Sequence, residues 1–349
     1  MRAAILRNKR IEVDDVPAPE PGPGEVLVKT LACGICGSDL HVLHRAQHEE
    51  AGGGGIVMGH EFIAELVDYG PETTKRLKRG ARVTSIPILG RKTGAEFIGY
   101  SAINTGGYGE FMRLTEDHLL EVPNGLPTEH AALNEPMSVG WHAVNKARLE
   151  PGDVPLVIGC GPIGLAVIAG LKIKGAHPIV AASRSPLRRR LAMTMGADIV
   201  VDPREQSPYE AWRAQAQTGL PDPGPTLPGW LVGSGLKPAV IFECVGGPGI
   251  IDEIMAGAPQ DARIVIVGLC FEEDRFQPMT GMRKELNIVF SNSFNRGEFA
   301  QTLSHLAEGK IDAAPLVTGK VGVDGVAGAM KELETPQAHA KILVEPWRA

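Results

Sequence analysis

Two patterns of hydrophobic and polar positions divide the chain near residue 150. Before that point, short apolar runs such as EVLVKT (25–30) and GARVTSI (80–86) alternate with segments rich in proline and glycine. Short β-type runs between turn residues predict a β-rich domain with many tight turns. We assign residues 1–148 to this first domain.

After that point, strand-like and helix-like segments alternate. The runs at 154–159, 177–183, 239–246 and 262–269 are apolar, and helical patterns occupy 161–176 and 185–197. Such alternation predicts an α/β fold with a doubly wound parallel sheet, of the Rossmann type. We assign residues 149–285 to it and expect 286–349 to finish the sheet edge and return to the first domain.

Two smaller features refine this second half. Ser185 is positioned to cap the helix at 185–197, with Pro186 in the first turn. Residues 203–238 break the alternation because proline and glycine dominate them, and we expect an irregular excursion around one short helix there.

Composition excludes several classes of protein. The length of 349 residues suits two domains, and 43% hydrophobic with 22% charged residues is ordinary for a globular protein. The net charge of -6 argues against nucleic acid as a partner, and no apolar stretch is long enough to span a membrane. Five cysteines are too few, and odd in number, for a disulfide framework, so we expect a cytoplasmic protein.

A glycine pattern indicates dinucleotide binding. Gly159-x-Gly161-x-x-Gly164 directly follows a predicted strand and opens a predicted helix. The first glycine would allow a tight turn, the second the approach of a pyrophosphate, and the third close packing of helix on sheet. The run VIVGL (265–269) ends a later strand where a nicotinamide ring should lie. The predicted cofactor contacts in these loops are Gly159, Gly161, Pro162, Ile163, Gly164, Val245, Val267, Gly268 and Leu269.

The end of the next predicted strand favours NADP over NAD. An acidic residue there would bind the ribose 2′-hydroxyl of NAD, whereas basic residues accept the 2′-phosphate of NADP. The sequence at this position is AASRSPLRRR, with no acid. Ser183 and Arg184 are the predicted phosphate contacts, and Arg188 is a further one.

The first domain carries candidate metal ligands. The stretch CGICGSDLH (33–41) holds Cys36, GHE follows with His60, and a carboxylate at Glu61 or Glu135 would complete a catalytic zinc site with one open position. A redox pair of Cys33 with Cys36 is disfavoured because such pairs begin a helix beside a βαβ unit.

Together these motifs resemble the zinc-dependent alcohol dehydrogenases of the medium-chain dehydrogenase/reductase superfamily. The resemblance spans the chain through PxPGPGEVLVK, GICGSDLH, GHE, GGYGEF, EPMSVGWH, GCGPIG, FECVG and AKILVEP. EPMSVGWH is similar to the polyol, threonine and butanediol dehydrogenase branch. The resemblance implies a GroES-like catalytic domain, a Rossmann domain, a homodimer or homotetramer, and oxidation of a small-molecule alcohol.

The resemblance also implies roles for individual residues. Cys36 and His60 would bind zinc, and either Glu61 or Glu135 would be the inner-sphere carboxylate. Asp39 would orient His60. The relay that removes the alcohol proton would start at Ser38 and end at His41.

The sequence departs from this family in two places. The region 87–111 contains none of the four cysteines that bind a structural zinc in many relatives, so we predict one zinc ion per chain. Our alignment places Ser293 where polyol dehydrogenases carry an arginine, which favours a simpler secondary alcohol. Two alternatives stay open: a zinc-free quinone or enone reductase of the same superfamily, and a non-catalytic dinucleotide-binding protein.

Overall fold

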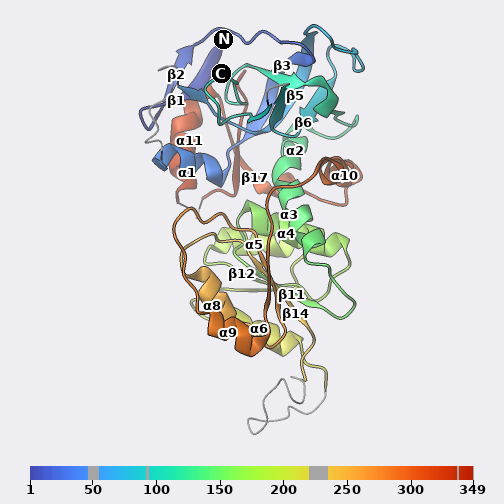
Figure 1. Ribbon diagram of the computed structural model, residues 1–349, viewed down its shortest axis with the longest axis vertical. Helices are drawn as coiled ribbons and strands as arrows, with labels where there is room; N and C mark the ends of the chain where they lie inside the picture. The colour runs from blue at the N-terminus through green and yellow to red at the C-terminus, as the bar shows by residue number, and fades with distance from the viewer. Residues whose placement is uncertain (46–54, 92–93, 220–234, 336–337, 349) are drawn as a thin grey trace. The chain divides into compact units, whose positions relative to one another are not determined.

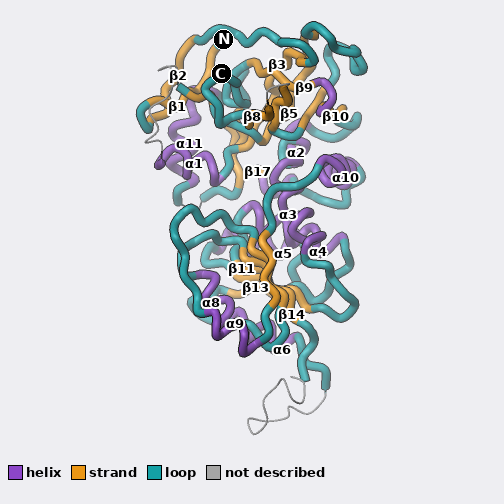
Figure 2. The backbone as a smooth tube through the Cα atoms, in the orientation of Figure 1, coloured by secondary structure: helices purple, strands orange, loops and turns teal. Residues whose placement is uncertain are grey.

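The computed structural model describes residues 1–45, 55–91, 94–219, 235–335 and 338–348 (Figures 1 and 2). The chain forms two compact units, Met1–Glu135 with Phe299–Ala349, and Pro136–Glu298. The sequence suggests boundaries after residues 148 and 285, and the compact units divide after 135 and 298. Of the irregular excursion expected at 203–238, residues 220–234 lie outside the described residues.

The first unit is built around a sheet of seven strands, which confirms the β-rich prediction. Its order is β10-β6-β5-β3-β18-β17, and β9 also pairs with β3. The bounds are β3 (Glu25–Gly34), β5 (Glu61–Tyr69), β6 (Arg82–Ser85), β9 (Phe111–Thr115), β10 (Leu119–Glu121), β17 (Val317–Val321) and β18 (Lys341–Val344). Because β3 pairs antiparallel with β5, β9 and β18, it is the strand that joins the two chain segments of this unit.

Smaller elements complete the first unit. A three-stranded sheet has the order β2-β1-β4, and β7 pairs with β8 as a separate hairpin. Their bounds are β1 (Arg2–Arg7), β2 (Arg10–Asp15), β4 (Ile56–Val57), β7 (Ile88–Arg91) and β8 (Gly94–Phe97). The helices are α1 (Gly37–Arg45), α2 (Thr128–Ala131) and α11 (Val326–Leu333), with 3-10 turns η1 (Glu116–His118), η2 (Ala314–Leu316) and η3 (Val323–Gly325). Apolar side chains from β1, β3, β5 and α11 share one buried core.

The second unit contains a six-stranded parallel sheet, which confirms the doubly wound prediction. Its order is β13-β12-β11-β14-β15-β16, and all neighbouring strands are parallel. The bounds are β11 (Val154–Ile158), β12 (Val180–Ala182), β13 (Ile199–Val201), β14 (Ala239–Glu243), β15 (Arg263–Ile266) and β16 (Asn287–Phe290).

Helices cover this sheet, as Figure 1 shows. They are α4 (Pro162–Ile173), α5 (Pro186–Met195), α6 (Pro208–Gln215), α8 (Ile250–Gly257) and α9 (Pro278–Lys284), while α3 (Asn134–Lys146) and α10 (Arg296–Ala307) run across the unit boundaries. One face of the sheet buries Trp212 of α6 and Ile254 of α8 in a continuous apolar core. The Trp212 indole N–H donates to Val154 O at 2.8 Å, which satisfies its one polar atom inside that core.

Local sequence signals explain the ends of α5. The Ser185 side chain accepts a hydrogen bond from Arg188 N at 3.4 Å, and Pro186 occupies the first turn, as predicted. Gly196 ends the helix with a φ of +120°, a left-handed conformation that favours glycine.

The turn from β11 into α4 depends on two glycines. Gly159 has a φ of +94°, so it takes the left-handed conformation that a tight turn needs. A Cβ atom at Gly164 would lie 1.9 Å from Gly159 O, so only glycine lets α4 approach the strand this closely. The predicted strand–turn–helix unit is therefore confirmed.

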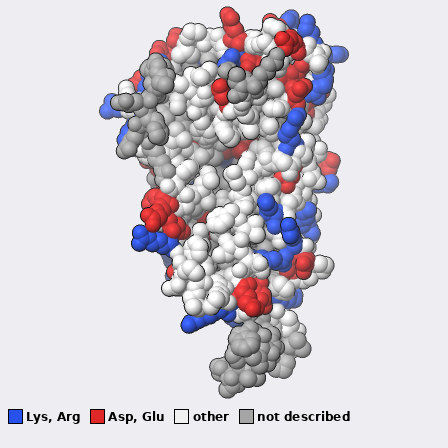
Figure 3. Space-filling view, in the orientation of Figure 1, with Lys and Arg blue, Asp and Glu red and all other residues white. Residues whose placement is uncertain are grey.

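The surface carries charges of both signs. Figure 3 shows acidic and basic side chains interspersed over the face in view, in keeping with the small net charge of -6. Among the described helices, none combines the length and apolar character that crossing a membrane requires.

The close approach at Gly164 yields a stability prediction. Gly164→Ala forces a methyl group against the Gly159 carbonyl, and we expect a loss of about 1–3 kcal/mol in the free energy of unfolding. Gly328→Ala in α11 is the matched control, because a Cβ atom there meets none of the described residues within 4 Å. Urea denaturation followed by circular dichroism compares the two variants; equal midpoints would contradict the packing argument.

Candidate active site

Three side chains with metal-ligand chemistry meet at one end of β3. Cys36 lies two residues beyond Gly34, the last residue of β3, while His60 and Glu61 lie at the start of β5. Gly34 pairs with Glu61 in the β3–β5 register, which brings the two segments together. As a result, the ligand atoms of Cys36, His60 and Glu61 all lie within 4.8 Å of one another.

This set fits a zinc ion. A thiolate, an imidazole and a carboxylate are the donor types of catalytic zinc sites, in which three protein ligands leave one position open. In the part of the chain that the structure describes, no other group of His, Cys, Asp or Glu side chains meets the same distance criterion. The structure thus brings Cys36, His60 and Glu61 together, as the sequence motifs suggest.

A buried carboxylate orients the histidine. Asp39 Oδ1 lies 3.5 Å from His60 Nδ1, which leaves Nε2 as the nitrogen that a metal ion would use. Asp39 Oδ2 accepts hydrogen bonds from Cys36 N at 2.9 Å and from the Tyr108 hydroxyl at 2.6 Å. Burial acts to raise the pKa of Asp39, but the charge of His60 and these hydrogen bonds hold it below its usual value.

The two cysteines of the CxxC segment have different surroundings. Both are free thiols, but Cys33 is fully buried and lies outside the ligand cluster. A Cβ atom added at Gly107 would lie 2.6 Å from Cys33 Sγ, so the thiol fills a tightly packed position. Burial raises the pKa of Cys33 well above its usual value, as expected for a thiol with a packing role.

Glu61 forms an ion pair that the sequence motifs do not reveal. Lys341 Nζ donates to both carboxylate oxygens of Glu61 at 2.7 Å and to Ile35 O at 2.9 Å. Both side chains are buried. Burial acts to lower the pKa of Lys341, but the Glu61 charge raises it above its usual value, so the amine stays protonated.

Glu135 lies near this cluster but outside the ligand set. It lies in the first turn of α3 and is half-buried. Loss of hydration raises the pKa of Glu135 to about 7, while the charge of His60 opposes the shift. Of the two candidate carboxylates, the structure places Glu61 closer to Cys36 and His60.

A serine and a tyrosine adjoin the cluster. Ser38 Oγ lies 2.6 Å from the Tyr100 hydroxyl, and the Tyr100 ring lies 5.1 Å from the His60 ring, centroid to centroid. Burial raises the pKa of Tyr100 above its usual value, so this hydroxyl stays protonated. His41 lies three residues after Ser38 in α1 and is exposed. Sequence reasoning missed Tyr100, which no motif marks.

The glycine turn of the second unit is open to a ligand. Gly161 is the N-cap of α4, and Pro162 and Ile163 begin the helix. Among the described residues, a Cβ atom at Gly161 would meet only Arg188 Nη1, at 3.8 Å. The turn therefore offers free space at a helix N-terminus, where a phosphate is favoured.

A buried glutamate organises the loops that follow β14 and β15. Glu243 Oε1 accepts from Val245 N at 2.6 Å and Gly246 N at 2.8 Å, and Oε2 accepts from Gly268 N at 3.2 Å. These bonds hold the predicted contacts Val245 and Gly268 in place beside Leu269. Sequence reasoning missed Glu243, although its place at the end of a predicted strand was a usable signal.

Two arginines near β12 have no partner among the described residues. Ser183 and Arg184 follow β12 directly, and Arg188 lies in the first turn of α5. The Arg188 Nε is buried without a hydrogen bond in the described part of the chain. Burial lowers the pKa of Arg188, because no nearby carboxylate compensates the lost hydration. The two guanidinium groups are thus available to an anion.

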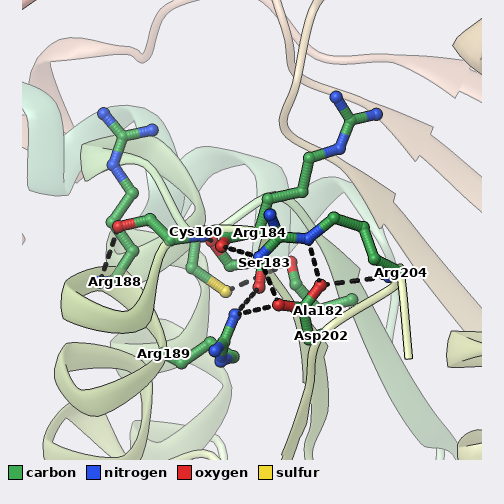
Figure 4. Close-up of polar contacts among 9 residues, drawn as sticks. Cys160, Ala182, Ser183, Arg184, Arg188, Arg189, Asp202 and Arg204 are labelled. Carbon is green, nitrogen blue, oxygen red and sulfur yellow. Dashed lines mark hydrogen bonds and ion pairs between the residues drawn. The ribbon is translucent and has the colours of Figure 1, made fainter. Parts of the chain in front are cut away.

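Arg189 and Arg204, which also lie near β12, are both paired with one carboxylate. Asp202 Oδ2 lies 2.7 Å from Arg189 Nη1, and Arg204 Nε donates to Asp202 Oδ1 at 2.9 Å. Arg204 Nη2 also donates to Arg184 O at 2.8 Å, which fixes that backbone. Figure 4 shows Arg189 and Arg204 converging on Asp202, whereas Arg184 and Arg188 point away from it. Hydrogen bonds from Arg204 hold the pKa of Asp202 well below its usual value, so this acid is fully compensated.

Comparison with known proteins identifies the family to which both units belong. Residues 22–124 match the alcohol dehydrogenase GroES-like domain, and residues 162–308 match the zinc-binding dehydrogenase domain. The chain is 32% identical to the (R,R)-butanediol dehydrogenase of Bacillus subtilis over 372 residues, covering 99% of this chain and 100% of that protein. It is 28% identical to the sorbitol dehydrogenase of the same species over 373 residues, covering 100% and 98%.

Solved structures agree. The crystal structure of 2R,3R-butanediol dehydrogenase from Bacillus subtilis superposes with a TM-score of 0.83 at 31% identity, covering 99% of each chain. A zinc-binding dehydrogenase from Sinorhizobium meliloti 1021, described as bound to NADP, gives 0.81 at 26% identity, again over 99% of each chain. The chain therefore belongs to the zinc-dependent alcohol dehydrogenases of the medium-chain dehydrogenase/reductase superfamily, in the branch of the butanediol and polyol dehydrogenases.

Proposed function

We propose that this dehydrogenase oxidises a secondary alcohol or vicinal diol to a ketone and transfers the hydride to NADP, reversibly. The observation that carries the proposal is the cluster of Cys36, His60 and Glu61, whose ligand atoms lie within 4.8 Å of one another. A zinc-free reductase has no use for such a set, and a non-catalytic protein has no use for the adjoining hydroxyl pair. Two electrons and one proton reduce NADP, and a second proton leaves to solvent.

Each residue of the first unit has a proposed task. When bound, zinc would supply Lewis-acid chemistry that lowers the pKa of an alcohol. Cys36 and His60 hold it, and Asp39 fixes the His60 ring by its 3.5 Å contact. Glu61 and Glu135 are the candidates for the third protein ligand. One zinc ion per chain is expected.

The proton leaves through the hydroxyl groups. Ser38 Oγ would accept the alcohol proton, while its 2.6 Å contact with Tyr100 fixes its orientation. Because the pKa of Tyr100 is raised, Tyr100 orients Ser38 and does not itself act as the base. His41, exposed on α1, is the proposed far end of the relay to solvent.

The partnerless arginines support NADP as the cofactor. The 2′-phosphate carries a charge of about -2, and bidentate pairing with guanidinium is strong. Arg184, Arg188 and the Ser183 hydroxyl are the proposed contacts. The neighbouring acid Asp202 is already neutralised by two arginines, so it does not repel a phosphate. The glycine turn and the loops held by Glu243 would bind the rest of the dinucleotide.

The substrate class follows from relatives and from one substitution. The similar proteins named above act on butanediol and sorbitol, which are both polyols with secondary hydroxyls. Ser293 is exposed and stands where our alignment expects a polyol-binding arginine. A small secondary alcohol or diol is therefore the proposed substrate.

An edge strand with exposed apolar side chains supports a homo-oligomer. β16 ends the parallel sheet, and Phe290 on it is 66% exposed, with Val289 and Met282 also exposed. An open edge with apolar side chains favours pairing with a second copy.

The cysteines support a cytoplasmic location. All five are free thiols, as expected in a reducing compartment.

Zinc content tests the metal set. Cys36→Ala and His60→Ala should each weaken zinc binding by roughly a hundredfold or more, since each removes a ligand atom. Cys33→Ala is the matched control, because Cys33 lies outside the cluster, and it should keep about one zinc per chain. Mass spectrometry of the metal in purified protein decides the matter; a zinc-free wild type would refute the metal proposal.

Turnover tests the cofactor and the substrate class. Purified protein should reduce NADP faster than NAD with 2,3-butanediol and other secondary alcohols, read by absorbance of the reduced nicotinamide. The double substitution Arg184→Ala with Arg188→Ala should raise KM for NADP at least about a hundredfold, because each of the two lost charge-assisted bonds contributes about 1.5–3 kcal/mol and 1.4 kcal/mol is about tenfold. KM for NAD should change little.

Arg190→Ala is the control for this prediction, because Arg190 is an exposed residue of the same helix outside the predicted contacts. Equal KM changes for NADP and NAD in the double variant would contradict the 2′-phosphate assignment. Turnover with NAD alone would contradict it while leaving the alcohol dehydrogenase activity in place.

Light scattering after size exclusion tests the oligomer. Wild type should run as a dimer or tetramer, and Phe290→Lys should shift it toward smaller species by placing a charge on the open edge of β16. Met193→Lys, on an exposed apolar residue of α5, is the control and should leave the mass unchanged. A monomeric wild type would rule out the edge-strand interface.

A further inference from the structure

A buried acid lies beside the loop that carries the proposed phosphate contacts. Asp202 comes directly after Val201, the last residue of β13, and is 6% exposed. Ala182 of β12 pairs with Val201 in the parallel register, and Ser183 N donates to Val201 O at 3.1 Å. This register places Asp202 next to the start of the loop that follows β12.

Asp202 holds two guanidinium groups, and each of them also donates to a backbone carbonyl of that loop. Arg189 Nη1 lies 2.7 Å from Asp202 Oδ2 and donates to Ser183 O at 2.8 Å. Arg204 Nε donates to Asp202 Oδ1 at 2.9 Å, and its Nη2 donates to Arg184 O at 2.8 Å. Two successive carbonyls are thus tied to one carboxylate, as Figure 4 shows, and we call Asp202, Arg189 and Arg204 the carbonyl clamp.

The carbonyl clamp determines which groups the loop offers to a ligand. A carbonyl oxygen is a hydrogen-bond acceptor and repels a phosphate, whereas a hydroxyl or a guanidinium group donates to one. Both carbonyls are bonded to the clamp, while the Arg184 guanidinium points away from Asp202 (Figure 4). Ser183 Oγ accepts from Ser185 N at 3.3 Å, so its own O–H is the donor that remains. The loop therefore presents donors to an anion.

Stability alone does not account for the carbonyl clamp. The Arg204 side chain is 60% exposed, and ion pairs with so exposed a partner contribute little to the free energy of folding. The hydrogen bond from Arg204 to the Arg184 carbonyl acts instead on the loop that carries the proposed phosphate contacts. A role in cofactor binding is the more direct explanation.

We propose that Asp202 is a positioning residue for the cofactor: through Arg189 and Arg204 it holds the loop after β12 in the conformation that binds the 2′-phosphate of NADP. The proposal rests on the NADP assignment made above and adds a residue from the neighbouring strand. A carboxylate after β12 would bind the ribose hydroxyls of NAD. This carboxylate follows β13 and is directed at two arginines, so it favours the phosphate that an acid would otherwise repel.

Asp202→Asn separates positioning from charge, because the amide has nearly the same shape but holds guanidinium groups weakly. Charge alone predicts tighter phosphate binding once the acid is removed. Positioning predicts the reverse: the dissociation constant of adenosine 2′,5′-bisphosphate should rise at least about tenfold, since charge-assisted hydrogen bonds that hold the loop are lost. Adenosine 5′-monophosphate has no 2′-phosphate, and its dissociation constant should stay within about twofold of wild type.

Isothermal titration calorimetry of the purified protein measures both dissociation constants. In turnover assays KM for NADP should rise by a similar factor while kcat stays unchanged, because the loop acts on binding and not on the chemical step. A merely structural defect would instead weaken the binding of both nucleotides.

Glu205→Gln is the matched control. Glu205 is an exposed acid directly after Arg204, so the substitution removes the same charge and leaves the carbonyl clamp in place. Both dissociation constants should stay within about twofold of wild type, because an exposed charge is screened by solvent.

Arg204→Lys covers the case in which Asp202→Asn does not fold. Lysine keeps the charge but lacks the planar fork that reaches the Asp202 carboxylate and the Arg184 carbonyl together. The dissociation constant of adenosine 2′,5′-bisphosphate should rise at least about threefold, since one hydrogen bond to the loop is lost.

Unchanged or tighter binding of adenosine 2′,5′-bisphosphate by folded Asp202→Asn would overturn the positioning role and leave the NADP assignment standing. Unchanged binding by Arg204→Lys would do the same. A wild type that binds the two nucleotides equally well would overturn the NADP assignment itself, and the positioning role with it.

Discussion

Compensation of buried charge is the constraint on which the first unit depends. Asp39, Glu61 and Lys341 are all essentially inaccessible to water, and His60 is nearly so. A buried charge is tolerated only when it is paired and hydrogen-bonded. Asp39 is balanced by His60 and Tyr108, and Glu61 by Lys341. The strand register around β3 places both buried carboxylates next to their partners.

The second unit must bind an anionic cofactor. It forms the binding site mostly from backbone groups. Gly159 and Gly164 shape the turn before α4, and the Glu243 carboxylate accepts hydrogen bonds from three backbone N–H groups. Arg184 and Arg188 add side-chain charges that no described carboxylate cancels.

Local motifs in the sequence were enough to predict both sheets and the glycine turn, because these depend on residues close together in sequence or on periodicity that survives without the partner strand. The meeting of Cys36 with His60 was expected from the order of the motifs and the family resemblance, since the β3–β5 register brings the two segments together. The helix cap at Ser185 is likewise a local signal, and it was confirmed. The domain boundaries and the roles assigned to Ser38 and His41 stay predictions.

The contacts that the sequence did not reveal are those created by register. Lys341 opens an apolar strand and reads as an ordinary flanking lysine, yet it meets Glu61 across 280 positions of chain. Tyr100 and Arg204 likewise carry no motif, and their partners depend on how separate segments pack. A single sequence does not encode which strand lies beside which in a form that inspection can extract.

The interleaved path of the chain has a consequence for its synthesis. The first unit is discontinuous, because β18 near the carboxyl end pairs with β3 near the amino end, whereas the second unit is one uninterrupted segment. During translation β3 emerges long before β18, the last strand that pairs with it. The parallel sheet of the second unit can therefore form before the first unit is complete. Until β18 arrives, Glu61 lacks the charge of Lys341, so the buried ion pair is among the last contacts of the first unit to form.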